Sequence, residues 1–187
     1  MGFHIAFVST IILFGIWTDR ANGACLTDDQ IAACDEVFNP VNMEEPCCIP
    51  LQGYIDVHNQ CMEEMGADEF TCYVSRCVTA KYRFRTRNVI EPELVRKKFR
   101  MFNYFDPDTK PLTDEIEDNC LDDHYFKYET NETSCDYNKF ELCANVNALM
   151  GCQDFHNSRH CDELVANVVI CKPVLRDYLH YLTGGSC

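Results

Sequence analysis

The spacing of apolar residues along the chain predicts helices from end to end. Thr27-Asp28-Asp29-Gln30 has the form of a capping box, and Ile31, Cys34 and Phe38 follow it at helical spacing. Similar stripes, three and four residues apart, run through 54–65, 70–78, 94–102, 137–144, 161–168 and 175–182. No repeat and no linker interrupts them. The pattern therefore predicts an all-α fold, one compact domain of about six to eight helices.

Start and stop signals place the ends of these helices. Proline suits a first helical position, and small polar residues suit the cap before it. The expected prolines are Pro50, Pro92 and Pro173, the expected caps are Asp68, Thr113 and Ser158, and the expected stops are Gly66 and Gly151. The basic, alternating run 81–87 is compatible with a short strand but is interpreted as a loop, and 122–136 as a long loop.

The first 23 residues have the pattern of a signal peptide. An apolar run from Ile5 to Trp17 is too short to span a bilayer comfortably, and the small residues Ala21 and Gly23 suit a cleavage site. A membrane anchor is the alternative. The pattern predicts a signal peptide over 1–23, a helical domain over 24–187 and an extracellular location.

The cysteines support that location. All 14 of them follow residue 23, and such a density in a secreted chain is typical of a disulfide scaffold. The even count allows seven bridges. A chain of this length also holds a real core, so the bridges supplement apolar packing and allow it to enclose a cavity.

Charge narrows the range of partners. The formal net charge of −14 repels phosphate backbones, which excludes nucleic acid as a partner. The run from Lys81 to Arg100 is basic in spite of this balance. Asn131-Glu132-Thr133 is an N-glycosylation sequon, with Asn131 as its acceptor.

The sequence contains no recognisable combination of catalytic residues, so we expect that the protein is not an enzyme and binds neither a cofactor nor a metal ion. It has no G-x-S-x-G and no H-E-x-x-H motif. His58 near Cys61 is similar to part of the secreted phospholipase A2 motif, but Asn59 stands where that family needs a calcium-binding aspartate. His156 and His160 have the i, i+4 spacing of half a zinc site, yet no third ligand is marked.

The order and spacing of the cysteines resemble those of insect odorant-binding proteins of the Plus-C subclass. A close pair, Cys72 and Cys77, is followed by a long gap to Cys120 and then by a ladder at Cys143, Cys152, Cys161 and Cys171. Cys47-Cys48 precedes this core, as a Cys-Cys often does in that family. Two features depart from it: four residues rather than three separate Cys72 and Cys77, which on a regular helix turns them about 140° apart, and Asp162 rather than proline follows Cys161.

The resemblance implies three disulfides, Cys48–Cys77, Cys72–Cys152 and Cys120–Cys161, with Cys47 and Cys48 bonded to two different partners. The remaining bridges, including those of Cys61, Cys143 and Cys171, cannot be paired from sequence. The resemblance also implies a carrier of small hydrophobic molecules such as odorants or pheromones. Such a carrier catalyses no reaction and functions in an extracellular fluid, either in olfaction or in a non-sensory tissue. A membrane receptor or a second copy of the chain would be its further partner.

The pocket of such a carrier would be lined by apolar residues of the middle and late helices. The candidates are Phe99, Phe102, Leu149, Met150, Val165 and Val169. The alternative is a secreted interaction or effector protein without a ligand pocket, whose disulfides support a surface, with the basic run from Lys81 to Arg100 as part of that surface. A cavity would favour the carrier, and a filled core the effector.

Overall fold

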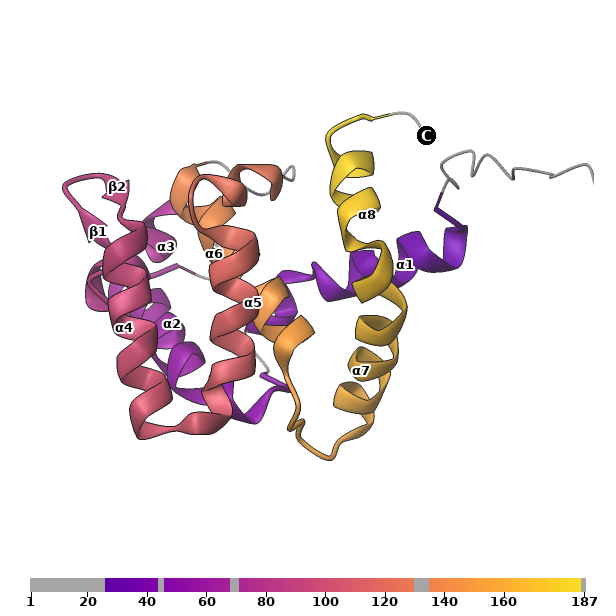
Figure 1. Ribbon diagram of the computed structural model, residues 1–187, viewed down its shortest axis with the longest axis horizontal. Coiled ribbons are helices and arrows are strands. Elements are labelled where there is room, and N and C mark those ends of the chain that lie inside the picture. The colour runs from indigo at the N-terminus through magenta and orange to yellow at the C-terminus, as the bar shows by residue number, and fades with distance from the viewer. Residues whose placement is uncertain (1–25, 44–45, 68–70, 130–134, 186–187) are drawn as a thin grey trace, which may run out of the picture.

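The computed structural model describes residues 26–43, 46–67, 71–129 and 135–185, and it is helical throughout apart from one short hairpin (Figure 1). The α-helices are α1 (Asp28–Val37), α2 (Gln52–Met65), α3 (Cys72–Lys81), α4 (Pro92–Phe105), α5 (Lys110–Cys120), α6 (Asp136–Gly151), α7 (Arg159–Cys171) and α8 (Leu175–Leu182). Short 3-10 helices are η1 (Pro40–Met43), η2 (Ile49–Leu51), η3 (Pro107–Thr109), η4 (His124–Lys127) and η5 (Lys172–Val174). The predicted all-α fold, a compact domain cross-linked by disulfides, is confirmed.

Several helix ends follow the expected local chemistry. The side chain of Thr27 accepts from the backbone of Gln30, whose own side chain returns the bond, so the capping box is complete. Ser158 caps α7, Pro92 opens α4, and Gly66 ends α2 in the left-handed conformation at φ 58°. These signals are local, which is why sequence alone located them.

Two predicted caps were wrong. Thr71 caps α3 through the backbone amide of Val74, whereas Asp68 lies outside the described residues. Helix α5 begins at Lys110, because the 3-10 turn at Pro107 runs directly into it, so Thr113 lies inside the helix. Its hydroxyl oxygen instead accepts a hydrogen bond of 2.9 Å from the side-chain amide of Asn103 on α4.

The basic run after α3 forms a hairpin, so its interpretation as a loop was wrong. Strands β1 (Arg85–Thr86) and β2 (Val89–Ile90) pair antiparallel, with Arg85 opposite Ile90. Arg87 in the turn has a φ of 59°, the sign that tight hairpin turns require. The hairpin folds the chain back so that Phe84 and Ile90 are buried.

Helix α6 is the centre of the fold. Nearly all of its side chains are buried, and it packs against α3, α5 and η4. The segment expected to be a long loop is ordered in part, because it forms η4 and buries the side chains of Tyr125 and Tyr128. A helix covered on every side loses the one-sided apolar pattern of a surface helix, and α6 accordingly carries buried Asn138, Glu141 and Asn147.

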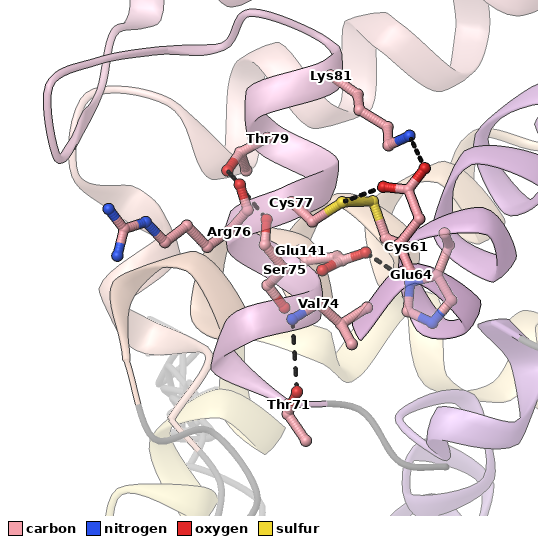
Figure 2. The surroundings of a disulfide bond; sticks show 11 residues. Cys61, Glu64, Thr71, Val74, Ser75, Arg76, Cys77, Thr79, Lys81 and Glu141 are labelled. Atoms are coloured by element: carbon pink, nitrogen blue, oxygen red, sulfur yellow. Dashed lines mark hydrogen bonds and ion pairs between the residues drawn. A yellow bond between two sulfur atoms is a disulfide. The ribbon is translucent and has the colours of Figure 1, made fainter. Parts of the chain in front are cut away.

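Three disulfides cross-link the helices around α6. Cys61–Cys77 joins α2 to α3, Cys72–Cys135 joins the starts of α3 and α6, and Cys120–Cys143 joins α5 to α6. Figure 2 shows the Cys61–Cys77 bridge, with the ion pair of Lys81 and Glu64 beside it at 2.8 Å. We refer to residues 50–151, which contain these bridges, as the central region.

The three pairs implied by the resemblance were therefore wrong in detail. Cys77 bonds Cys61 rather than Cys48, Cys72 bonds Cys135 rather than Cys152, and Cys120 bonds Cys143 rather than Cys161. The order of pairing nevertheless agrees: in both sets the first cysteine joins the third, the second joins the fifth and the fourth joins the sixth. Cys72 and Cys77 point in different directions along α3, as their spacing requires, and so reach different helices.

The other three described bridges are nested one inside another. Cys34–Cys171 joins α1 to the end of α7, while Cys47–Cys161 and Cys48–Cys152 hold the two ends of the connection between α6 and α7. The expectation that Cys47 and Cys48 bond different partners is confirmed. We refer to α1, α7, α8 and the segments bonded to them as the flanking region; it lies to the right of the central region in Figure 1.

Two predictions concern residues that the structure does not describe. The signal peptide over 1–23 and the sequon at Asn131 both fall in ranges that the structure does not describe. All ten cysteines expected to form bridges do so. No helix in the described ranges is both long and apolar enough to cross a bilayer.

Candidate functional site

The central region contains an apolar pocket of about 420 Å³ between α2, the hairpin, α4, α5 and α6. This volume is in the range of small-molecule sites. Its wall is lined by Pro50, Leu51, Gly53, Tyr54, Tyr82, Phe84, Phe99, Phe102, Phe105, Asp106, Thr109, Leu112, Thr113, Ile116, Phe140 and Ala144. Phe105, 77% exposed, lies at its mouth.

The wall is a continuous cluster of aromatic rings. Tyr82 stacks between Tyr54, at a centroid distance of 5.7 Å, and Phe84, at 5.2 Å. Phe84 then meets Phe99 edge-on at 5.8 Å and Phe140 at 6.1 Å. Rings packed against one another hold their orientations, so this wall is already formed without a ligand.

The chain after α3 positions the two central rings of the cluster. Arg83 adopts a left-handed φ of 60°, which turns the chain out of α3. The backbone amide of Phe84 then donates to the carbonyl of Thr79 at 2.9 Å, and Glu91 donates back to Phe84 at 2.8 Å. Phe84 is thus fixed at both backbone groups before its ring enters the pocket wall.

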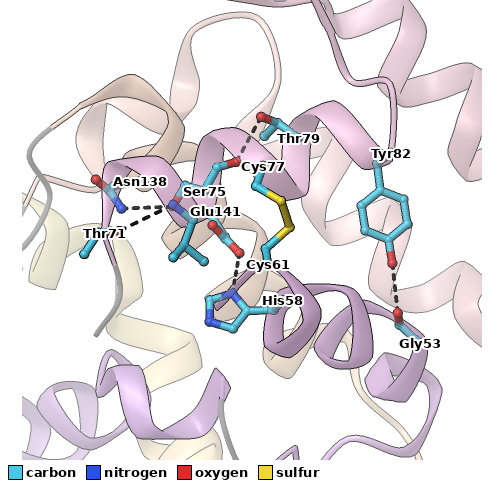
Figure 3. A network of polar contacts seen from close by, with 11 residues as sticks. Gly53, His58, Cys61, Thr71, Ser75, Cys77, Thr79, Tyr82, Asn138 and Glu141 are labelled. Carbon is cyan, nitrogen blue, oxygen red and sulfur yellow. Dashed lines mark hydrogen bonds and ion pairs between the residues drawn. A yellow bond between two sulfur atoms is a disulfide. The ribbon is translucent and has the colours of Figure 1, made fainter. Parts of the chain in front are cut away.

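Tyrosine hydroxyls supply polar groups in this wall. Figure 3 shows the Tyr82 hydroxyl donating to the carbonyl oxygen of Gly53 at 3.0 Å. Burial raises the pKa of Tyr82 to about 12, with nearby Asp56 and Glu141 adding to the shift. Burial also raises the pKa of Tyr54 well above its ordinary value, and the carboxylate of Glu141 adds to that shift. Both hydroxyls therefore stay neutral at physiological pH.

A buried polar pair lies behind these tyrosines. The Nδ1 atom of His58 on α2 is 2.8 Å from Oε1 of Glu141 on α6, and both side chains are almost fully buried (Figure 3). Burying such groups is costly unless they are hydrogen-bonded. The pair thus ties α2 to α6 directly behind the aromatic wall.

The rim near α5 is more polar but internally satisfied. The side chain of Asn103 donates to Thr113 at 2.9 Å and accepts from Thr109 at 2.9 Å. Asp106 accepts from the backbone amide of Asp108. These groups bond one another, so the rim orients helices α4 and α5 and leaves most of the pocket apolar.

The arrangement can bury an apolar molecule, and its lining lacks the elements of a hydrolytic centre. The single carboxylate of the lining, Asp106, stands at the exposed rim, without a histidine or cysteine among the other lining residues. Within the described residues, no cluster of three or more His, Cys, Asp and Glu side chains could hold a metal ion. His156 lies outside α7 and His160 lies near its start, so the two do not share a helical face.

Two of the six predicted pocket residues line this pocket: Phe99 and Phe102 of α4. The structure places the other four elsewhere. Val165 and Val169 lie beside the buried face of α7, which consists of Cys161, Leu164, Val168 and Cys171, and Val169 is 68% exposed. Leu149 and Met150 are buried near the C-terminal end of α6, away from this pocket. Because α6 is buried on every side, its sequence pattern does not indicate which of its residues face the pocket.

The sequence interpretation missed Tyr82 and Phe84, the centre of the aromatic wall. Their signal was present: in Tyr82-Arg83-Phe84-Arg85 apolar and basic residues alternate, which is the period of a strand with one buried face. Tyr54 lay on a predicted helical stripe with His58 but was not assigned to a pocket. Phe140 and Ala144 of α6 had no distinguishing signal, because their whole helix is apolar and buried.

A second hollow lies between the two regions and is lined by charged as well as apolar side chains. Its volume is about 890 Å³, and its wall includes Glu115, Lys127, Lys172, Arg176 and Asp177, together with Met150. Lys172 bonds both Glu115 and the carbonyl oxygen of Met150, each at 2.7 Å. Positive and negative side chains pair with each other across this hollow, so its wall is neither uniformly charged nor uniformly apolar toward a ligand.

Comparison with protein-family models, curated proteins and solved structures finds no match to this chain.

Proposed function

We propose that this protein is a secreted carrier that reversibly binds small hydrophobic molecules, of the odorant or pheromone kind, without changing them. The observation that carries the proposal is the preformed aromatic pocket of the central region. Filling it removes apolar surface from water on both the ligand and the wall. At about 25 cal/mol per Å², a ligand burying roughly 300 Å² gains about 7 to 8 kcal/mol, which is the scale of micromolar binding.

The disulfide order supports the same proposal. The pairing of first to third, second to fifth and fourth to sixth cysteine is the one that the resemblance to odorant-binding proteins implies, and it recurs here around the pocket. A bridged wall resists collapse when the pocket is empty, which a carrier needs in order to bind and release its cargo. The bridges also fit an oxidising, extracellular compartment.

The direct test is a titration of the oxidised protein with an apolar fluorescent probe, followed by displacement with panels of volatile and lipid-like compounds. We expect saturable one-site binding in the micromolar range and competitive displacement. Absence of saturable binding to protein whose helicity is shown by circular dichroism would remove the carrier function. The helical scaffold would then be an effector surface.

A matched pair of variants ties the binding to this pocket. Phe102→Ala removes a ring from the wall and should weaken probe binding about tenfold, the order of a lost aromatic contact. Val169→Ala removes apolar atoms from the exposed face of α7 and should leave the affinity unchanged within twofold. Equal effects from the two substitutions would place the probe outside this pocket.

A further inference from the structure

The outer face of α4 carries an apolar stripe that no described element covers. Leu94, Met101 and Phe105 are spaced by seven and four residues, which places them on one side of the helix. All three are exposed, Phe105 at 77%, and Tyr104 beside them is 81% exposed. Val95, Phe99 and Phe102, about a third of a turn away on the same helix, face the core and the pocket. Helix α4 thus has two apolar faces, only one of which is packed.

Basic side chains flank this outer stripe. Lys98 follows Leu94 by one turn, and Lys97 and Arg100 border the stripe on its other side. The segment 81–100 contains eight basic and two acidic residues, a net charge of +6 in a chain whose net charge is −14. Much of the positive charge of the protein therefore lies on the hairpin and α4, at the left edge of the molecule in Figure 1.

The stripe is continuous with the mouth of the pocket. Phe105 belongs both to the stripe and to the pocket lining, and its ring lies 5.3 Å from that of Tyr104. Nζ of Lys98 lies 5.3 Å from the ring centre of Phe102 in the pocket wall. A surface that binds this face would therefore cover the entrance of the pocket.

We propose that the outer face of α4, with the adjoining hairpin, docks on an anionic lipid surface. Apolar side chains between lysines and arginines are the arrangement of helices that lie in a membrane interface: rings enter the acyl boundary, and cations reach the phosphate layer. Asp106 and Asp108 follow Phe105 and oppose this attraction at one end, so the middle of α4 and the hairpin supply it. Docking itself stands apart from the carrier function; only its use, transfer of cargo between pocket and bilayer, rests on that function.

The test is co-sedimentation with vesicles of phosphatidylcholine alone and of phosphatidylcholine with about a third phosphatidylserine. We expect binding to the anionic vesicles only, and its loss on raising the salt from about 0.05 to 0.5 M. Lys97→Glu with Arg100→Glu should lower the partition coefficient at least about 30-fold, since each lost cation is worth about fivefold. Arg159→Glu with Arg176→Glu makes the same charge change on α7 and α8 and should leave partitioning within a few-fold.

A second measurement reports insertion of the stripe. Phe105→Trp places a single tryptophan on the outer face of the mature protein, because Trp17, the only other tryptophan, lies in the predicted signal peptide. Its fluorescence should shift to the blue on anionic vesicles and be quenched by brominated lipid. Equal binding to neutral vesicles, equal losses from the two charge-reversal pairs, or no binding at all would each overturn the proposal. Probe titration of the Lys97/Arg100 variant separates the two proposals, because neither side chain lines the pocket and the variant should still bind the probe with unchanged affinity.

Discussion

Among the described residues, the central and flanking regions are each held by three disulfides, but the two sets have different topologies. In the central region the bridges interlock: Cys72–Cys135 begins within the span of Cys61–Cys77 and closes beyond Cys120. In the flanking region the bridges are nested, so that Cys34–Cys171 encloses Cys47–Cys161, which encloses Cys48–Cys152. The first set fixes several helices relative to one another, and the second joins an early segment to a late one.

This difference matches what each region contains. Interlocked bridges reach α2, α5 and α6, which line the aromatic pocket, and α3, which leads directly into Tyr82 of its wall. They hold these helices at a fixed separation around the pocket. Nested bridges accompany a packed contact between α1, α7 and α8, where Phe38 meets the ring of Tyr178 and the Tyr178 hydroxyl donates to Asp35. The same kind of covalent bond therefore supports a cavity in the central region and a tightly packed contact between helices in the flanking region.

The largest expected difference in stability between the regions comes from breaking one ion pair in each, His58–Glu141 and Arg159–Glu163. Glu141→Ala removes the partner of His58 from a fully buried site and should lower the free energy of unfolding by about 3 to 5 kcal/mol. Glu163→Ala breaks the exposed pair with Arg159 on α7 and should cost less than about 0.5 kcal/mol. Urea unfolding measures both values, and similar costs would contradict the assignment of His58 and Glu141 to the core.

Removing one bridge from each region should separate stability from binding. Cys34→Ser with Cys171→Ser should cost about 3 kcal/mol, because Cys47–Cys161 still closes most of the loop, and should leave probe affinity within twofold. Cys61→Ser with Cys77→Ser, across a separation of 16 residues, should cost a similar amount but weaken the probe about tenfold or more, since α2 and α3 carry Tyr54 and Tyr82. Unfolding and probe titration of both variants provide the check. Loss of binding in the first variant would mean that the pocket depends on both regions.

Two glycines of the central region should respond with opposite signs. A Cβ atom at Gly151 would lie 2.4 Å from the carbonyl oxygen of Pro111, so Gly151→Ala forces α5 and α6 apart and should cost about 1 to 3 kcal/mol. A Cβ atom at Gly53 meets nothing within 4 Å, so Gly53→Ala should stabilise α2 by about 0.5 to 1 kcal/mol. Thermal unfolding of the two variants tests the close contact, and stabilisation by Gly151→Ala would refute it.

Alkaline titration gives the smallest predicted effect and compares the tyrosines of the two regions. Burial raises the pKa of Tyr82, Tyr125 and Tyr128 in the central region to about 12, from 10.0. Burial and the bond to Asp35 also raise the pKa of Tyr178 in the flanking region. The stability that these neutral hydroxyls contribute is present below about pH 10 and is lost as the pH rises through about 12.

Absorbance of tyrosinate measures this titration. Part of the change from the nine tyrosines should appear only above about pH 11 in the folded protein and shift toward pH 10 in denaturant. Asp35→Asn should lower the pKa of Tyr178 without moving the central group. A single step near pH 10 in the folded protein would contradict the burial of all these hydroxyls.

The sequence by itself determined the helices, several of their ends and the disulfide-linked character of the fold. Capping at Thr27 and Ser158 and termination at Gly66 rest on bonds within one turn, and local pattern is enough to locate them. The spacing of Cys72 and Cys77 gives an angle of about 140° on a regular helix, but it does not specify where either cysteine bonds. Of the candidate pocket, sequence located Phe99 and Phe102, because the apolar stripe of α4 is clear.

Only the tertiary structure decided the disulfide partners and the rest of the pocket wall. A disulfide forms between cysteines whose Cα atoms lie within about 6 Å of each other in the fold. The bonded cysteines are 16 to 137 residues apart in the sequence, so no local pattern shows which of them come together. Phe84, on which Tyr82 stacks, meets Phe140 only because the chain after α3 folds back against α6. Helix α6 has no exposed face, so its pattern could not separate Phe140 and Ala144 from Leu149 and Met150; packing against different neighbours did that.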